Sequence, residues 1–173
     1  MSSLQKFHRR TMAIVSGPAI GSGSSTKGYY LGLAGDGTSY MYVEPLSDVR
    51  LAWGSYGTVR GTISTTNGLV NTNTLYAFGS AAHPAAYRCK TLTVGGYNTW
   101  YLPSEYECSI LNINQNTVPF ATSNGFVGAQ HWTSTEVDAN NAKRWYFDPL
   151  TGNGFSGVKN VGIANRAVRR STI

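Results

Sequence analysis

The sequence predicts an α+β protein, chiefly because of the order of its elements. Segments typical of strands occupy the first and last thirds of the chain, and two segments typical of helices lie between them. There is no strand–helix alternation of the kind that builds a parallel sheet. The composition agrees, since only 13% of the 173 residues are charged, about half of the usual share of roughly 25%. Glycine, threonine, serine and asparagine supply the polarity instead, and they favour turns and short strands over long helices.

The first predicted strands surround a glycine-rich turn. Residues 29–33 and 40–44 flank the sequence Gly-Asp-Gly at 35–37, which predicts a hairpin. Residues 49–53 can supply a further short strand. Residues 69–92 then carry leucine, alanine and cysteine side chains that suit helical packing, and Pro84 breaks or restarts this helix.

The second helix has a clearer start. Ser104 and Glu107 form a capping box, in which the serine is the N-cap and the glutamate is the third helical residue. Cys108 and Leu111 give this helix its buried face, with Tyr106 as a further candidate for that face, and the asparagines at 112–116 end it. Strands are predicted again over residues 131–135, 143–148 and 163–169, with a turn over 148–154.

The net charge of +6 is unevenly distributed, because four basic residues precede the first acid, Asp36. We therefore divide the chain into a basic, glycine- and serine-rich arm over residues 1–27 and a domain over residues 28–173. Apolar side chains in the arm suit docking on a neighbouring protein. No zinc-finger, helix-turn-helix or RNA-binding sheet pattern accompanies the charge, so we expect no nucleic-acid partner. The residues predicted to mediate assembly are Lys6, Phe7, Arg9, Arg10 and Ile14.

Neither export nor a membrane span is indicated. The apolar run from Met12 to Val15 is too short for a signal peptide, and no run approaches the length of a spanning helix. We therefore expect a product that stays in the cytoplasm until it is used. Cys89 and Cys108 allow either one disulfide or two free thiols, and a cytoplasmic product favours two buried thiols.

Four segments resemble one known family in the family's own order. Residues 96–104 (GYNTWYLPS) resemble its G-Y-x-D-W-x-L-P-S segment, residues 131–136 (HWTSTE) its Y-W-S-S-T-E, and residues 166–169 (RAVR) its closing V-R-A-V-R. Residues 52–54 and 85–89 also look similar. The family is the Lcl-type C-terminal domain of bacteriophage fibre or adhesion proteins and bacterial surface proteins, and the resemblance covers about residues 28–170.

The resemblance implies a C-type-lectin-like fold, with two helices against short, twisted antiparallel sheets. In such a fold Trp100 and Trp132 are expected to fill the core between helix and sheet. Arg166 and Arg169 are expected to pair with Glu136 or Glu105 and so to hold the last strand. These roles are structural.

The sequence offers little for catalysis or metal binding. The Glu-Pro-Asn, Gln-Pro-Asp and Trp-Asn-Asp sequences of calcium-dependent lectins do not occur, so we expect no calcium and no other cofactor. The three histidines are scattered, and no nucleophile elbow, metalloprotease or phosphate-loop motif is present. We therefore predict that the protein is not an enzyme.

Recognition or assembly is the remaining class of function. A weak ligand site is predicted around residues 140–146, where at least one of Trp145 and Phe147 points into the core. We predict a bacteriophage virion protein assembled in the host cytoplasm, namely a capsid decoration, a tail-fibre tip or a neck appendage. Its partners would be other virion proteins, further copies of itself and a host-surface glycan or protein. A bacterial surface adhesin or an oligomerising spacer are the alternatives. The predicted ligand residues are Asn140, Asn141, Lys143, Arg144 and Tyr146.

Overall fold

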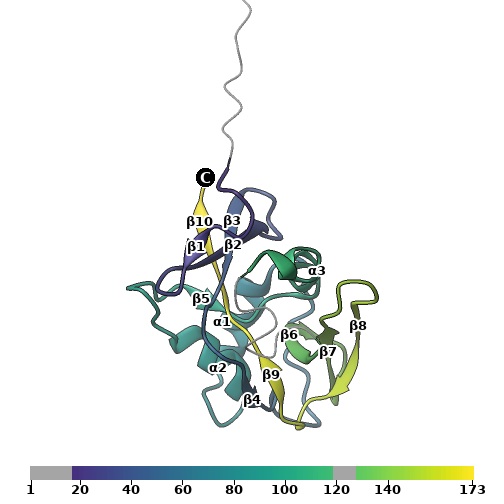
Figure 1. Ribbon diagram of the computed structural model, residues 1–173. Coiled ribbons are helices and arrows are strands. Elements are labelled where there is room, and N and C mark those ends of the chain that lie inside the picture. Colours follow the sequence, from purple (N-terminus) through teal and green to yellow (C-terminus); the bar gives the residue numbers. More distant parts are fainter. Residues whose placement is uncertain (1–16, 119–127) are drawn as a thin grey trace, which may run out of the picture.

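A computed structural model describes residues 17–118 and 128–173. Within these residues the chain forms ten strands in two five-stranded sheets, together with three short helices (Figure 1). The prediction of a C-type-lectin-like α+β fold with two helices is therefore wrong, because the protein is mostly β. The longest helix has 10 residues, so each helix can only fill a gap beside the sheets rather than form a layer of its own.

The first sheet has the strand order β1-β2-β3-β10-β5, and every neighbouring pair in it is antiparallel. The register of β2 against β3 shifts at a bulge between Tyr30 and Gly32. The glycine-rich hairpin is confirmed, since β2 and β3 flank it. The strands of this sheet are β1 (Gly23–Ser24), β2 (Gly28–Leu33), β3 (Ser39–Val43), β5 (Trp100–Tyr101) and β10 (Val168–Thr172).

The second sheet has the order β4-β9-β6-β7-β8. Its pairs are antiparallel except for β6 with β9, which run parallel through His131 and Ala164. The predicted strand over 163–169 is in fact two strands, β9 and β10, which lie in different sheets. The strands of this sheet are β4 (Val49–Leu51), β6 (Gln130–Glu136), β7 (Asn141–Tyr146), β8 (Asn153–Val158) and β9 (Ile163–Asn165).

The predicted helical stretch over 69–92 forms two helices, α1 (Gly68–Tyr76) and α2 (Pro84–Thr91). Pro84 is the first residue of α2, where its missing N–H has no helical partner to lose. The third helix, α3 (Glu105–Asn114), confirms the capping box: Ser104 Oγ accepts from Glu107 N, and Glu107 Oε2 accepts from Ser104 N. A short 3-10 turn, η1 (Gln115–Thr117), follows it.

Two apolar clusters form the core. One lies between the first sheet and α3 and contains Leu31, Met41 and Cys108, while the other joins α1 and α2 to Trp53, Trp100 and Trp132. The prediction that Trp100 and Trp132 are core residues is confirmed, since both are fully buried. Phe147 is also buried, and Trp145 packs against the first cluster.

The segment that was predicted to be an arm is partly built into the first sheet. Gly23 and Ser24 form β1, which pairs with Tyr29 and Gly28, and Gly17 lies against the ring of Tyr40. The predicted assembly residues Lys6, Phe7, Arg9, Arg10 and Ile14 lie outside the described residues. The C-terminus lies at the same end of the molecule as the start of the described chain (Figure 1). No helix among the described residues is long and apolar enough to cross a membrane.

Candidate functional site

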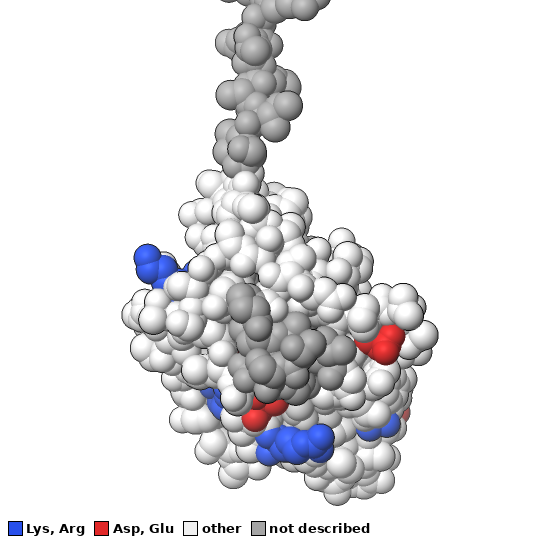
Figure 2. Space-filling model, in the orientation of Figure 1, with Lys and Arg blue, Asp and Glu red and all other residues white. Residues whose placement is uncertain are grey.

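All eight acidic residues of the chain fall within the described residues, and each has a partner in the chain. Some accept backbone hydrogen bonds in turns, and others pair with arginine, lysine or histidine. Figure 2 shows charged side chains standing singly or in small groups on one face of the molecule. The acids are Asp36, Glu44, Asp48, Glu105, Glu107, Glu136, Asp138 and Asp148.

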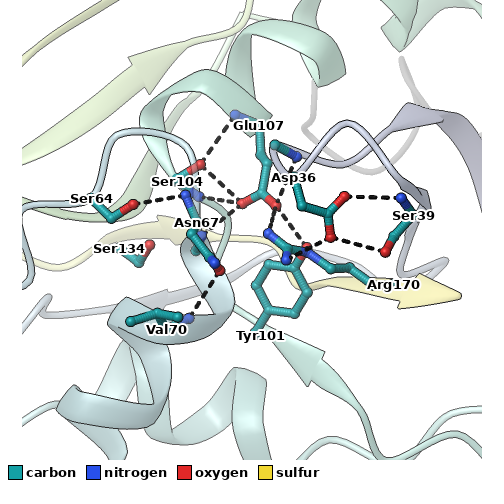
Figure 3. A network of polar contacts seen from close by, with 12 residues as sticks. Asp36, Ser39, Ser64, Asn67, Val70, Tyr101, Ser104, Glu107, Ser134 and Arg170 are labelled. Carbon is teal, nitrogen blue, oxygen red and sulfur yellow. Dashed lines mark hydrogen bonds and ion pairs between the residues drawn. The ribbon is translucent and has the colours of Figure 1, made fainter. Parts of the chain in front are cut away.

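Glu107 is the centre of a buried network that ties α3 to β10 and β5, the last two strands in the order of the first sheet (Figure 3). Its carboxylate accepts from Tyr101 Oη at 2.8 Å and from Arg170 Nη2 at 2.9 Å. It also accepts from the backbone N–H of Gly68, at the start of α1, at 3.1 Å. The side chain is fully buried. One carboxylate therefore connects β5, β10, α1 and α3.

Glu136 and Lys159 form a second buried network beside the irregular segment that precedes α1. Lys159 Nζ lies 2.6 Å from Glu136 Oε1 and also donates to the carbonyl oxygen of Thr58. The other oxygen of Glu136 accepts from the backbone N–H groups of Arg60 and Gly61. The pair thus holds a segment that has no ladder hydrogen bonds of its own.

The predicted partners of Arg166 and Arg169 are wrong. Arg166 pairs with Asp48, and Arg169 donates to the carbonyl oxygen of Lys27 and stacks on the rings of Tyr42 and Tyr97. The two acids expected there are already bound elsewhere, Glu136 by Lys159 and Glu105 by Lys143. Arg166 lies between β9 and β10, at the crossing from one sheet to the other, so Asp48 is the nearer acid.

His83 gives the fold a predictable response to acid. Burial and the nearby cation of Arg60, which donates from Nε to His83 Nε2 at 3.0 Å, lower the pKa of His83 from 6.5 to about 4. Between these values the unfolded chain binds a proton that the folded chain does not. The contribution of His83 to the free energy of unfolding is therefore fully present above pH 6.5 and is lost as the pH falls toward 4.

We expect the free energy of unfolding to fall by about 2 kcal/mol between pH 7 and pH 5. Urea unfolding at the two pH values measures this difference. The variant His83→Gln keeps a hydrogen-bond acceptor but cannot titrate. In this variant most of the difference in the free energy of unfolding between pH 7 and pH 5 should disappear. Equal stability of the natural protein at both pH values would contradict the assignment.

The predicted ligand residues gather along β7 and the turn before it, and most of them already have partners. Asn141 and the backbone N–H of Asn140 donate to Asp138. Lys143 Nζ lies 3.0 Å from Glu105 Oε1. Arg144 donates to Gln130, and its guanidinium lies 4.5 Å from the centre of the Phe155 ring. Tyr146 is half-buried at the end of the strand. Ligand binding at these residues stays a prediction.

The two cysteines are separate, buried free thiols, as the sequence favoured. They belong to different apolar clusters, Cys108 to that of α3 and Cys89 to that of α2. Burial raises the pKa of Cys89 to about 12 and that of Cys108 well above its usual value. Both thiols therefore stay protonated and shielded. Among the described residues, no group of three or more histidine, cysteine or acidic side chains could hold a metal ion.

An open apolar groove lies between the β2–β3 hairpin and α3. It encloses about 400 Å³, and no charged side chain lines it. Three of its apolar side chains are strongly exposed, Ile113 at 78%, Tyr106 at 50% and Leu33 at 41%. The residues that line it are Gly32, Leu33, Ala34, Gly35, Gly37, Tyr106, Ile110, Ile113 and Asn114.

Sequence reasoning missed this groove, although α3 carries a signal for it. Tyr106, Ile110 and Ile113 are spaced four and three residues apart, which places them on one side of the helix. The core side is formed by Cys108 and Leu111. A helix with a single core face would carry polar residues at positions 106, 110 and 113, on the side away from Cys108 and Leu111. The second apolar stripe is the feature that marks this surface.

Comparisons with known proteins place the chain in no family. Neither a family model nor a curated protein matches the sequence. Among solved structures, the chain is similar to the crystal structure of a fimbrial protein from Bacteroides ovatus, with 17% sequence identity and a TM-score of 0.46. The similarity covers 77% of this chain and 35% of that chain, so this protein spans about a third of the length of the solved chain.

Proposed function

We propose that the protein is a non-enzymatic structural protein of a bacteriophage virion, which binds neighbouring proteins through an exposed apolar surface. The observation that carries this proposal is the groove between the β2–β3 hairpin and α3. Contiguous exposed apolar surface is costly in a soluble monomer and commonly marks a contact with another molecule. Ile113 has 78% of its surface exposed, so a partner that covers it removes apolar surface from water, which is favourable.

The positions of the reactive side chains support a structural role. Every acidic residue is bound within the chain, and the two thiols are buried with raised pKa values. His83 is buried and donates no proton near neutral pH, because its pKa is lowered to about 4. These groups hold loops and strands together. The side chains left exposed at the groove are apolar, and they suit binding rather than proton transfer.

The virion location rests on the resemblance of residues 96–104 and 131–136 to a domain of phage fibre and adhesion proteins. The test is mass spectrometry of particles purified by density gradient from a lysate of the host. We expect peptides of this chain at a constant ratio to the major capsid protein, and antibody-gold label at one fixed position on the particles. Peptides confined to the bacterial envelope fraction would overturn the virion location in favour of the adhesin alternative.

A further inference from the structure

We propose that two copies of this chain form a twofold symmetric dimer, in which the outer stripe of each α3 packs into the groove of the other copy. The outer stripe consists of Tyr106, Ile110 and Ile113, and the groove is the one between α3 and the β2–β3 hairpin. This inference rests on the proposed function, because it names the partner that covers the exposed apolar surface. α3 and the hairpin lie beside one another in the fold (Figure 1).

The hairpin side of the groove favours side chains over an added strand. Residues 21 and 22 already bond to both backbone groups of Tyr30. The next carbonyl along β2, that of Leu31, accepts from Asn114 Nδ2. These bonds leave little of the strand edge for a further strand. An occupant therefore binds chiefly by packing side chains into the groove.

The lining of the groove leaves room for large apolar side chains. Ile20 adds to its apolar surface, since a Cβ placed on Gly32 would lie 4.0 Å from Ile20 Cδ1 and 3.2 Å from Ile110 Cγ2. Small residues opposite a helix form holes that protruding side chains of a second helix can fill. The small residues on the hairpin side are Gly32, Ala34, Gly35 and Gly37.

α3 of a second copy has the residue pattern that such a groove receives. An apolar groove can bind the apolar face of a helix, whose anchor residues recur at positions i, i+3, i+4 and i+7. Tyr106, Ile110 and Ile113 occupy positions i, i+4 and i+7, over roughly 10 Å of helix. They lie on the side away from the buried residues Cys108 and Leu111. One surface of the chain thus carries both a groove and a helix face that suits it.

This arrangement makes the contact reciprocal. Because the outer stripe and the groove border one another, each copy can offer both to the other, as in an interface with twofold symmetry. A net charge of +6 makes copies of the chain repel one another. The lining of the groove contains no charged side chain, so this contact brings no like charges together.

The exposed apolar area is sufficient for a dimer. With about 200 Å² for a fully exposed large side chain, four residues leave roughly 400 Å² exposed in each copy. Apolar atoms form about 65% of homodimer interfaces, so two copies predict a total interface of roughly 1,200 Å², at the lower end for specific complexes. The four residues are Ile20, Leu33, Tyr106 and Ile113.

The first test is analytical ultracentrifugation of the purified full chain. We expect an equilibrium of monomer and dimer without larger species. Ile113→Glu should stay monomeric, since it would bury a charge in the apolar groove of the partner. Urea unfolding of dilute protein checks that this variant folds. Leu150→Glu, at a position 94% exposed in the β7–β8 turn and outside the groove, is the matched control and should dimerise like the natural protein.

The second test is a disulfide between two different chains. A tagged Ile113→Cys variant is mixed with an untagged Leu33→Cys variant and oxidised with diamide. We expect a heterodimer that a reducing agent separates, because the outer stripe of one copy meets the hairpin of the other. Leu150→Cys in place of Leu33→Cys should give far less heterodimer. The natural Cys89 and Cys108 are buried, and the unsubstituted protein should stay unlinked.

Three results would overturn the proposal. The first is natural protein that stays monomeric above about 100 µM, since interfaces of standard size bind at micromolar concentrations or below. The second is a species whose mass keeps growing with concentration, because a twofold contact closes at the dimer. The third is equal cross-linking with Leu33→Cys and Leu150→Cys.

The same experiments separate this inference from the proposed function. A monomer in solution, with peptides at a constant ratio in purified particles, would keep the virion role and assign the groove to a different virion protein. A dimer that is absent from virions would overturn only the virion location.

Discussion

Replacement of Glu107 by alanine is expected to lower the free energy of unfolding by about 3–5 kcal/mol, the usual cost of breaking a buried ion pair from one side. The substitution removes an acceptor shared by the side chains of Tyr101, Arg170 and Ser104 and by three backbone N–H groups. Arg170 keeps its contact with Asp36 at 2.9 Å, near the surface. The buried backbone N–H groups of Ser104 and Gly68 lose their acceptor. Each buried donor left without an acceptor costs about 1–3 kcal/mol.

The matched control is Glu105→Ala, two positions earlier in the same helix. Glu105 pairs with Lys143, and both side chains are partly exposed, at 23% and 31%. Partly exposed pairs of this kind contribute about 1 kcal/mol or less. Urea unfolding of both variants measures the difference between their free energies of unfolding in the same protein. A cost for Glu107→Ala no greater than that for Glu105→Ala would contradict the assignment of Glu107 as the centre of the network.

Local signals in the sequence predicted most individual elements. The Gly-Asp-Gly turn predicted the β2–β3 hairpin, Ser104 and Glu107 predicted the start of α3, and Pro84 predicted a break in the helical stretch. Each of these signals acts over a few residues, through a turn conformation, a capping hydrogen bond or a missing N–H. They state where an element begins or ends, and they do not depend on the rest of the fold.

The arrangement of the elements could not be predicted in this way. β10 pairs with β3 and β5, so its partners lie about 130 and 70 residues earlier in the chain. Nothing local to residues 163–169 indicates that the chain leaves one sheet and enters the other there. The capping box likewise revealed two bonds of Glu107 but not those to Arg170 and Gly68. The groove was missed because Tyr106, Ile110 and Ile113 look like a core stripe until the other side of α3 is seen to be buried.

Removal of Glu136 is expected to have the other large effect, because it leaves a lysine ammonium with no acid in the interior. Glu136→Ala should cost about 3–5 kcal/mol. Lys159 is fully buried, and it would keep only carbonyl acceptors, those of Thr58 and Ala139. The backbone N–H groups of Arg60 and Gly61 would lose their acceptor as well.

Lys159→Met should cost less than Glu136→Ala, because the carboxylate would still accept from Arg60 and Gly61. In the double variant Glu136→Gln/Lys159→Met no buried charge remains, and the glutamine oxygen can still accept from those N–H groups. Its cost should therefore be smaller than that of Glu136→Ala alone, since a neutral pair avoids the desolvation of two ions. Urea unfolding gives the costs, and a double-mutant cycle with Glu136→Gln gives the coupling.

Hydrogen exchange locates the effect within the molecule. If the pair holds the segment before α1, the amides of Arg60 and Gly61 should lose protection in Glu136→Ala, while those of β2 and β3 keep theirs. Uniform loss across both sheets would instead mean that the pair supports the whole fold and not this segment. The groove lies on the other sheet, beside β2 and α3. A variant that loses amide protection only in the segment before α1 should therefore keep the oligomeric state of the natural protein. This comparison separates the stability of that segment from assembly.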